Sequence, residues 1–259
     1  RVRKLLQGTA SLEFWETYEN PEVYQYLVEA NNTIKNILAD VTPADTSALA
    51  LAADSTKVLA AAAAPDSTKT VSDSAKVAKE LLAGVIQTDS LSGNEIAMAK
   101  ENPLFFVLNP SVAQGQLLPG ACIGRAHYKD TAKIGYWLRL PQVQAQFPAD
   151  LRPLWTVKAV DPSNVIYELI AIKANTRDGR APLDGGVVTD ANRSFGNNSA
   201  VPEVDMAMNA EGARIWATMT ANNVGRQIAI VLDGMVYSYP RVNGEITGGR
   251  SNISGQFTI

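Results

Sequence analysis

Residues 226–238 read RQIAIVLDGMVYS, and this stretch decides the fold. It holds a short run rich in Ile and Val, the dipeptide Asp233-Gly234, and a second run, Met235 to Ser238. An Asp-Gly pair between two apolar runs is a strong signal for a tight turn. The stretch therefore predicts a β-hairpin.

The segment before the hairpin predicts a helix and a strand. Asn209 stands in the N-cap position before an apolar stripe at helical spacing, which includes Trp216 and ends near Asn222. Residues 201–208 alternate apolar and mostly polar side chains, which is typical of a half-buried strand. We expect the order strand, capped amphipathic helix, hairpin.

The order and spacing of motifs between Val201 and Thr258 resemble the large periplasmic domain of the SecD family, including fused SecDF proteins. The pattern runs strand, Glu-Gly-Ala helix, Asn-Val-Gly, Ala-Ile-Val-Leu-Asp-Gly, Ser-x-Pro, Ile-Thr-Gly-Gly and Ile-Ser-Gly-x-Phe-Thr. Its marker residues are Asn223, Gly225, Asp233, Gly234, Pro240, Gly248, Gly249, Gly255 and Phe257.

The resemblance implies an α+β fold with a discontinuous ferredoxin-like base and an inserted α+β head. Residues 184–191 look like the segment that re-enters the base, and residues 12–16 like its first strand. We expect the base at 1–19 plus 187–259 and the head at 20–186. Within the head, the Ala/Ser/Thr-rich segment 41–70 predicts disorder or marginal helix, and the turn-rich segment 177–186 predicts a linker.

Apolar patterns predict the elements of the head. We expect helices over 21–38, 72–86 and 130–140, and strands over 104–108, 155–160 and 165–172. The two chain crossings between head and base are expected to act as a hinge, since hinges need only a few residues that absorb a backbone change. The hinge candidates are Asn20, Pro21, Gly179, Pro182, Gly185 and Gly186.

Composition argues against several classes of function. The chain has 259 residues, with 23 basic and 26 acidic side chains and a net charge of −3, so no cationic surface for nucleic acid is implied. Only one cysteine, Cys122, and one histidine, His127, are present, which excludes an internal disulfide and a structural zinc site. We expect no metal and no cofactor.

No arrangement of residues predicts catalysis. Cys122 and His127 would need a spatial contact and a third orienting group to form a nucleophile, and we interpret them as a small buried thiol and a loop histidine. The glycine pairs at 185–186 and 248–249 lack the spacing of phosphate-binding loops and fit turns better. We therefore expect that the chain is not an enzyme.

The function implied by the resemblance is mechanical. A SecD-like domain would capture unfolded preprotein on the periplasmic face of the bacterial inner membrane and help the proton motive force to drive translocation. Its partners would be SecF, separate or fused, and the SecYEG channel. The candidates for holding the polypeptide are large apolar and aromatic residues of the head, because such side chains bind by apolar burial: Leu104, Phe105, Phe106, Tyr136, Trp137 and Trp155.

The chain itself has no apolar run of the roughly 20 residues needed to cross a bilayer, and no signal peptide pattern is visible. Because the family has membrane helices on both sides of this domain, we expect a soluble piece of a multi-pass membrane protein. The alternative is an extracytoplasmic ligand- or carbohydrate-binding module that uses exposed aromatic side chains. A saccharide-dependent thermal shift would favour that alternative.

Overall fold

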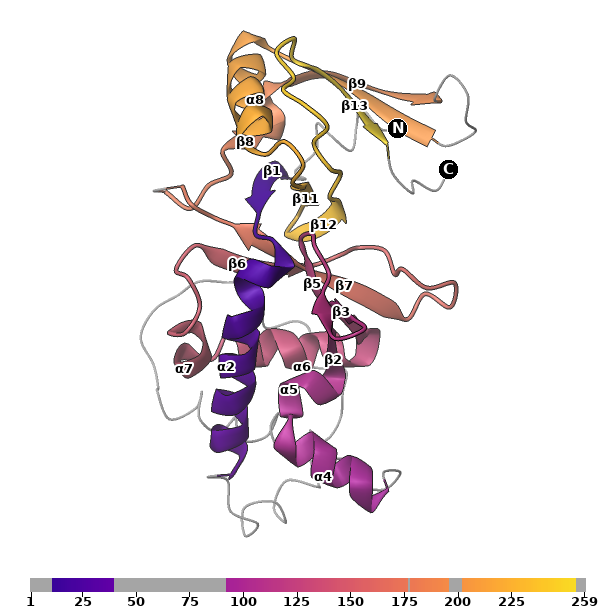
Figure 1. The fold of residues 1–259 in the computed structure, drawn as a ribbon. Helices are drawn as coiled ribbons and strands as arrows, with labels where there is room; N and C mark the ends of the chain where they lie inside the picture. The colour runs from indigo at the N-terminus through magenta and orange to yellow at the C-terminus, as the bar shows by residue number, and fades with distance from the viewer. Residues whose placement is uncertain (1–10, 40–91, 177, 196–201, 255–259) are drawn as a thin grey trace.

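The structure, a computed structural model, describes residues 11–39, 92–176, 178–195 and 202–254. At one end lie helix α8 and a small sheet, at the other a group of helices, and a large antiparallel sheet joins them (Figure 1). The predicted low-complexity segment 41–70, the predicted helix 72–86, and the motif residues Gly255 and Phe257 fall outside the described residues.

The large sheet has eight strands in the order β12-β11-β1-β7-β5-β2, with β6 also paired to β7 and β8 to β1. Its strands are β1 (Leu12–Thr17), β2 (Leu108–Pro110), β5 (Cys122–His127), β6 (Leu151–Trp155), β7 (Ile166–Lys173), β8 (Leu183–Asp184), β11 (Ile228–Leu232) and β12 (Met235–Ser238). A separate short hairpin pairs β3 (Val112–Ala113) with β4 (Gln116–Leu117).

The large sheet curls, so that the end of β6 lies beside β12. Thr156, directly after β6, forms an isolated bridge with Val236 of β12, and the Val157 N–H donates to the Val236 carbonyl at 2.9 Å. Inside the curl lies a core that includes Trp15, Ile170 and Val231. The segments predicted as base and as head therefore share one sheet and one core.

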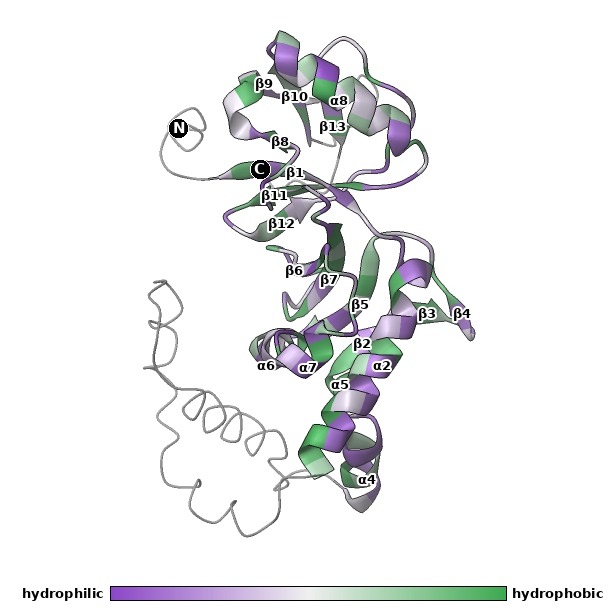
Figure 2. Ribbon diagram, turned by 90° about the vertical axis from the view of Figure 1, so that its left-hand side faces the viewer, coloured by the Kyte–Doolittle hydropathy of each residue, from purple (hydrophilic) through white to green (hydrophobic). Residues whose placement is uncertain are grey.

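A group of helices lies at the part of the large sheet that contains β2, β5 and β7. They are α2 (Asn20–Ala39), α4 (Gly93–Glu101), α5 (Pro103–Val107), α6 (Tyr128–Leu138) and α7 (Pro141–Gln144). The largest core cluster fills the space between α2, α5, α6 and α7 and strands β2, β5 and β7. Figure 2 shows that α2 carries both hydrophobic and hydrophilic residues, and its buried stripe of Val23, Leu27, Ala30 and Ile34 has helical spacing.

The small sheet has the order β13-β10-β9, with β9 (Val188–Phe195), β10 (Pro202–Met208) and β13 (Arg250–Ser254). A one-turn 3-10 helix, η4 (Gly185–Val187), precedes β9, and α8 spans Ala210–Asn222. Phe14 of β1 and Trp216 of α8 meet edge to face, with ring centroids 5.4 Å apart, in the core between α8 and the two sheets. Both side chains are buried.

The mixed α and β composition with antiparallel sheets confirms the predicted α+β class. The predicted helices over 21–38 and 130–140, the strand over 165–172, and the strand, helix and hairpin between 201 and 238 are all present. Asn209 caps α8 as predicted, since its side chain accepts a hydrogen bond from the Gly212 N–H.

Two predictions about local structure were wrong. Residues 104–108 are mostly helix α5, because Pro103 begins a helical turn that buries Leu104 and places Leu108 at the start of β2. The strand expected at 155–160 lies earlier, at Leu151–Trp155. The segment 177–186, predicted as a linker, contains β8, whose buried Leu183 lies opposite Phe14 of β1.

Candidate polypeptide-binding groove

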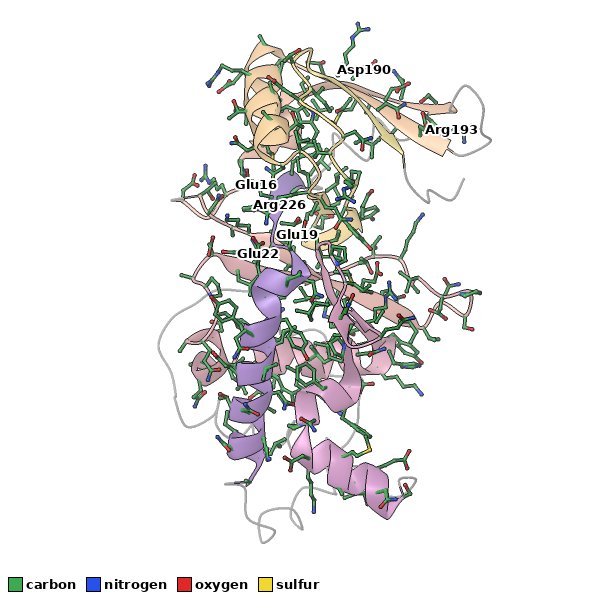
Figure 3. All side chains as sticks on the ribbon, viewed as in Figure 1. Glu16, Glu19, Glu22, Asp190, Arg193 and Arg226 are labelled. Atoms are coloured by element: carbon green, nitrogen blue, oxygen red, sulfur yellow. The ribbon has the colours of Figure 1, made fainter. Side chains whose placement is uncertain are left out.

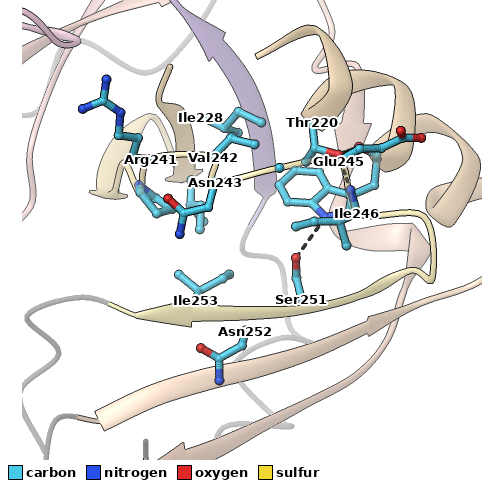
Figure 4. Close-up of a pocket in the computed structure, with 14 residues that line it drawn as sticks. Thr220, Ile228, Arg241, Val242, Asn243, Glu245, Ile246, Ser251, Asn252 and Ile253 are labelled. Atoms are coloured by element: carbon cyan, nitrogen blue, oxygen red, sulfur yellow. Dashed lines mark hydrogen bonds between the residues drawn. The ribbon is translucent and has the colours of Figure 1, made fainter. Parts of the chain in front are cut away.

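A groove of about 420 Å³ opens between the small sheet and the large one (Figure 4). One wall is the β13 strand with Ile253, and the other is formed by Ile228 and Ile230 of β11 and by the segment 240–246. Its volume lies in the range of ligand pockets, about 300–1,000 Å³. The lining residues are Trp216, Thr220, Ile228, Ile230, Pro240, Arg241, Val242, Asn243, Gly244, Glu245, Ile246, Ser251, Asn252 and Ile253.

Strand alternation explains why the groove is apolar inside. In β11, Ile228 and Ile230 point to the α8 side, whereas Ala229 and Val231 point into the curled sheet. Among the hydrogen bonds that involve side chains lining the groove, the Trp216 indole N–H donates to Ser251 Oγ at 2.9 Å, and the Ile246 N–H donates to Thr220 Oγ1 at 3.0 Å. Asn243 and Glu245 at the rim are exposed.

Gly249 sets the position of β13. Its φ is +61°, a left-handed conformation that L side chains rarely adopt, and its carbonyl accepts from the Met208 N–H at 2.8 Å. A Cβ at Gly249 would lie 2.6 Å from Ala213 Cβ on α8. Only glycine allows the chain to pass this close to the helix and then enter β13.

A buried carboxylate holds the segment that leads into the groove wall. Glu168 of β7 is 4% exposed and accepts from Arg125 Nη2 at 2.9 Å and from the Tyr239 hydroxyl. Burial raises the pKa of Tyr239, and the hydrogen bond to the negative Glu168 raises it further. Tyr239 directly precedes Pro240, so this network fixes where the groove wall begins.

We expect Tyr239→Phe to lower the free energy of unfolding by about 1–3 kcal/mol, because it leaves a buried carboxylate without one of its donors. Urea denaturation would measure the loss. Tyr237→Phe is the matched control: Tyr237 is 47% exposed, and such surface changes usually alter stability by less than about 0.5 kcal/mol. Equal effects of the two substitutions would contradict the assigned role of Tyr239.

The predicted preprotein-binding residues of the head differ in accessibility. Leu104 and Trp137 are fully buried, so no partner reaches them in this conformation. Phe105, Tyr136 and Trp155 are partly buried against the same core. Phe106 alone among the six is exposed, at 40%. The structure therefore does not bring these residues together into an apolar binding surface.

The predicted hinge at Asn20-Pro21 lies in a dense set of polar contacts. Figure 3 shows Glu16, Glu19, Glu22 and Arg226 gathered where β1 passes into α2. Arg226 Nη2 donates to Glu22 Oε1 at 2.5 Å, and the Gly120 N–H donates to Glu19 Oε2 at 2.6 Å.

Asn20 itself is fully buried, and its amide donates to the carbonyls of Ser111 and Leu118 at 2.8 and 3.0 Å.

The other hinge candidates lie on the surface or half-buried. Gly179 occupies an exposed turn with a φ of +68°, and Pro182 is half-buried just before β8. Gly185 and Gly186 belong to the 3-10 turn η4, where the Gly186 N–H donates to Asp184 Oδ1 at 2.8 Å.

Cys122 and His127 show no sign of nucleophile activation. Burial raises the pKa of the Cys122 thiol, and its sulfur accepts a hydrogen bond from Ser111 Oγ at 3.3 Å. His127 caps α6, where its Nδ1 accepts from the Lys129 N–H at 3.2 Å. Among the described residues, no group of three or more His, Cys, Asp or Glu side chains is arranged to hold a metal ion.

Sequence reasoning missed the groove, although it marked several of its residues. Pro240, Ile246 and Ile253 lie in the SecD-like pattern between Val201 and Thr258, but their spacing in the sequence does not indicate that they line one groove. The available signal was the turn-rich segment 240–249, which separates an apolar hairpin from a last short strand. Such a segment is where binding residues often lie.

The fold and the groove define an α+β domain in which an apolar groove lies between the large antiparallel sheet and the small three-stranded one. The family model described as "SecDF, P1 head subdomain" matches residues 170–259. A protein translocase subunit SecD from Rhodothermus marinus is 36% identical over 98% of this chain. A second, from Acidaminococcus fermentans, is 45% identical over 37% of the chain. The chain belongs to the SecD/SecDF family.

The chain spans 35% of the Rhodothermus marinus protein and 23% of the Acidaminococcus fermentans protein. A solved SecDF from Thermus thermophilus, described as a translocon-associated membrane protein, is 35% identical over 31% of this chain and 11% of its own, with a TM-score of 0.28. The match to a solved structure described as "a membrane component SecDF that enhances protein export" covers 37% of each chain, at 30% identity and a TM-score of 0.27. In the described part of the chain, no helix has the length and apolar character needed to span a membrane.

Proposed function

We propose that this chain is a periplasmic domain of a Sec translocon accessory subunit and that it binds unfolded preprotein in the groove beside β13. The groove carries the proposal, because residues of the SecD-like motif line it and apolar walls next to a strand suit a polypeptide of any sequence. The relation to SecD along nearly the whole chain supports the same reading.

In this proposal the parent protein is a multi-pass protein of the inner membrane, and its energy source is the proton motive force. Protons are relayed by buried ionisable groups in membrane helices, so the domain supplies binding and movement and no catalysis. Partners reached through the parent are SecF and the SecYEG channel. Motion does work on the preprotein only if the affinity differs between two orientations of the domain.

The division into a ferredoxin-like base, 1–19 plus 187–259, and a head, 20–186, stays a proposal. The family model named for the head subdomain matches 170–259, which includes most of the proposed base. Strand pairing between β1 and β7 and the bridge between Thr156 and Val236 also join the two parts. Any movement of one against the other has to open these contacts as well as bend the chain.

We propose that such bending occurs at Asn20-Pro21 and at 179–186, and that the ion pair of Glu22 with Arg226 holds one orientation. Glu22 belongs to the head segment and Arg226 to the base segment. A second contact across the same boundary is the Ala121 N–H, which donates to Gln227 Oε1 at 2.6 Å. Both contacts lie near the junction between the end of β1 and the start of α2.

The contribution of Glu22 to the stability of the folded state should depend on pH. Partial burial acts to raise its pKa, but the Glu19 N–H and the Arg226 guanidinium outweigh it, so the pKa lies below the ordinary 4.5. A lowered pKa in the folded state means that the stabilisation is present above about pH 4.5 and is lost as pH falls through the folded-state value.

We therefore expect Glu22→Gln to cost less than about 1 kcal/mol at neutral pH, since the side chain is 44% exposed, and nothing at low pH. Urea denaturation at several pH values measures this. A cost that grows on acidification would contradict it.

Fluorescence anisotropy of labelled unfolded secretory polypeptides, titrated with the chain, tests the function. We expect saturable binding that a folded protein of the same size does not show, and weaker binding by Ile246→Ser, which removes part of the groove wall. Val224→Ser is the control, because Val224 is 53% exposed and does not line the groove. Absence of binding would refute the proposal for this domain.

A further inference from the structure

Within residues 11–39, 92–176, 178–195 and 202–254, no second strand pairs with the outer edge of β13. The strand pairs with β10 on one side, from Ala207 opposite Arg250 to Glu203 opposite Ser254. Among the residues that the structure describes, its main chain makes no other backbone hydrogen bond. In an antiparallel strand, alternate residues turn their N–H and C=O groups to each side, so β13 presents a row of groups that no described backbone group pairs with.

This edge opens onto the apolar groove. Ser251 and Ile253 turn their side chains toward it, and both are buried. Across the groove, the segment 243–248 makes no backbone hydrogen bond to another backbone group of the described chain. The space beside β13 is therefore bounded by Ile228, Ile230 and Ile246, and no strand of the described residues fills it (Figure 4).

A second groove, of about 480 Å³, lies over the other face of the small sheet. Ser251 and Asn252 of β13 line both grooves. Two carboxylates, Asp190 and Asp205, line the second groove, and Glu203 lies beside it, held with Asp205 by the Asn252 amide at 2.7 and 2.8 Å.

Among the described residues that line the second groove, acidic side chains outnumber basic ones. None of the three carboxylates forms an ion pair within the described ranges. Arg250 is the one cationic residue among those that line the groove, so negative charge prevails there.

We propose that β13 accepts an extended polypeptide segment as an added strand, and that the segment carries apolar and basic side chains in alternation. The proposal rests on the function proposed above and names the class of ligand for the same groove. Unpaired N–H and C=O groups at strand spacing are satisfied by another backbone.

In an added strand, successive side chains point to opposite faces. One set enters the apolar groove beside Ile253, and the other faces the polar side of the small sheet. A residue opposite Asn252 lies two strand spacings, about 10 Å, from the backbone of Asp205. A long basic side chain at that position extends toward the paired carboxylates, which attract it at short range.

The test uses the 259-residue chain and labelled peptides that alternate Val with Lys, or Val with Glu. We expect the Lys peptide to bind about two- to fivefold more tightly, the range of one exposed ion pair. The variant Asp205→Asn should lower that preference. Asp178→Asn, an exposed carboxylate outside both grooves, should leave it unchanged.

Backbone methylation separates strand addition from other modes of binding. Two Lys peptides carry N-methyl groups on one or the other set of alternate residues. Only one set faces β13, so one peptide should bind about tenfold more weakly, the cost of about two hydrogen bonds, and the other should bind as before.

Equal binding by both methylated peptides, with the Lys peptide still bound, would overturn strand addition and leave the proposed function standing. Equal affinity of the Lys and Glu peptides would overturn the role of the carboxylates. If no peptide and no unfolded polypeptide binds, the proposed function itself fails.

Discussion

Replacing Trp137 by alanine should lower the free energy of unfolding by about 3–5 kcal/mol, the usual cost of truncating a buried tryptophan. Trp137 is fully buried in the largest core, where helices α6 and α2 meet strands β5 and β7. The substitution leaves a cavity that the surrounding helices cannot fill. Urea denaturation followed by far-UV circular dichroism measures the loss.

Two controls keep this prediction specific. Trp137→Phe retains most of the ring, and it removes an indole N–H that has no hydrogen-bond partner in the described structure, so we expect a cost below about 1.5 kcal/mol. Phe106→Ala, at a position that is 40% exposed, should also cost much less than Trp137→Ala. A similar large loss for Phe106→Ala, or none for Trp137→Ala, would contradict the described core.

Gly249→Ala should destabilise the chain by about 2–5 kcal/mol. A left-handed conformation costs an L residue about 1–2 kcal/mol, and overpacking adds about 1–3 kcal/mol. The added Cβ would lie 2.6 Å from Ala213 Cβ, and α8 would have to move away from β13 to accommodate it. Because β13 forms one groove wall, binding of unfolded polypeptide should weaken in the same variant.

Gly248→Ala is the matched control for Gly249→Ala. A Cβ at Gly248 would meet no atom within 4 Å, and its φ is not in the left-handed range. We expect a change of less than about 0.5 kcal/mol, as for ordinary surface substitutions. If the two neighbouring glycines respond alike to thermal and urea denaturation, the close approach of Gly249 to α8 is wrong.

Local patterns predicted the elements that depend on neighbours in sequence. The turn at Asp233-Gly234 has φ values of +50° and +79°, both left-handed, as a tight hairpin turn requires. The α8 segment likewise contains its own start signal, the N-cap residue Asn209, and its own apolar stripe, which forms the buried face. In such segments the sequence alone determines the conformation to a large extent.

Short apolar runs were less predictable. Five apolar residues from Leu104 to Leu108 suit a strand or a helix equally, since periodicity cannot separate the two at this length. The helix forms because Pro103 supplies a favourable first position and the Leu104 side chain reaches the core. Tertiary packing decided the outcome.

The groove could not be predicted because its walls are joined only by distant pairings. Asp205 of β10 lies opposite Asn252 of β13, and these residues are 47 positions apart in the chain. Ile228 faces the groove only because β1 and β12 flank β11 and set which side of it meets α8. The motif residues in the segment 240–254 are recognisable in the sequence, but their convergence on one groove is not.

Photocrosslinking during translocation in the parent membrane protein tests directly whether preprotein binds in the groove. A photoreactive amino acid replaces Asn243 at the groove rim, and separately Phe106 and the exposed Asn94 on α4. We expect a translocating preprotein to crosslink at position 243 and not at position 94. Crosslinking at position 106 without any at 243 would contradict the groove as the binding site, and crosslinking at none of the three would contradict preprotein binding by this domain.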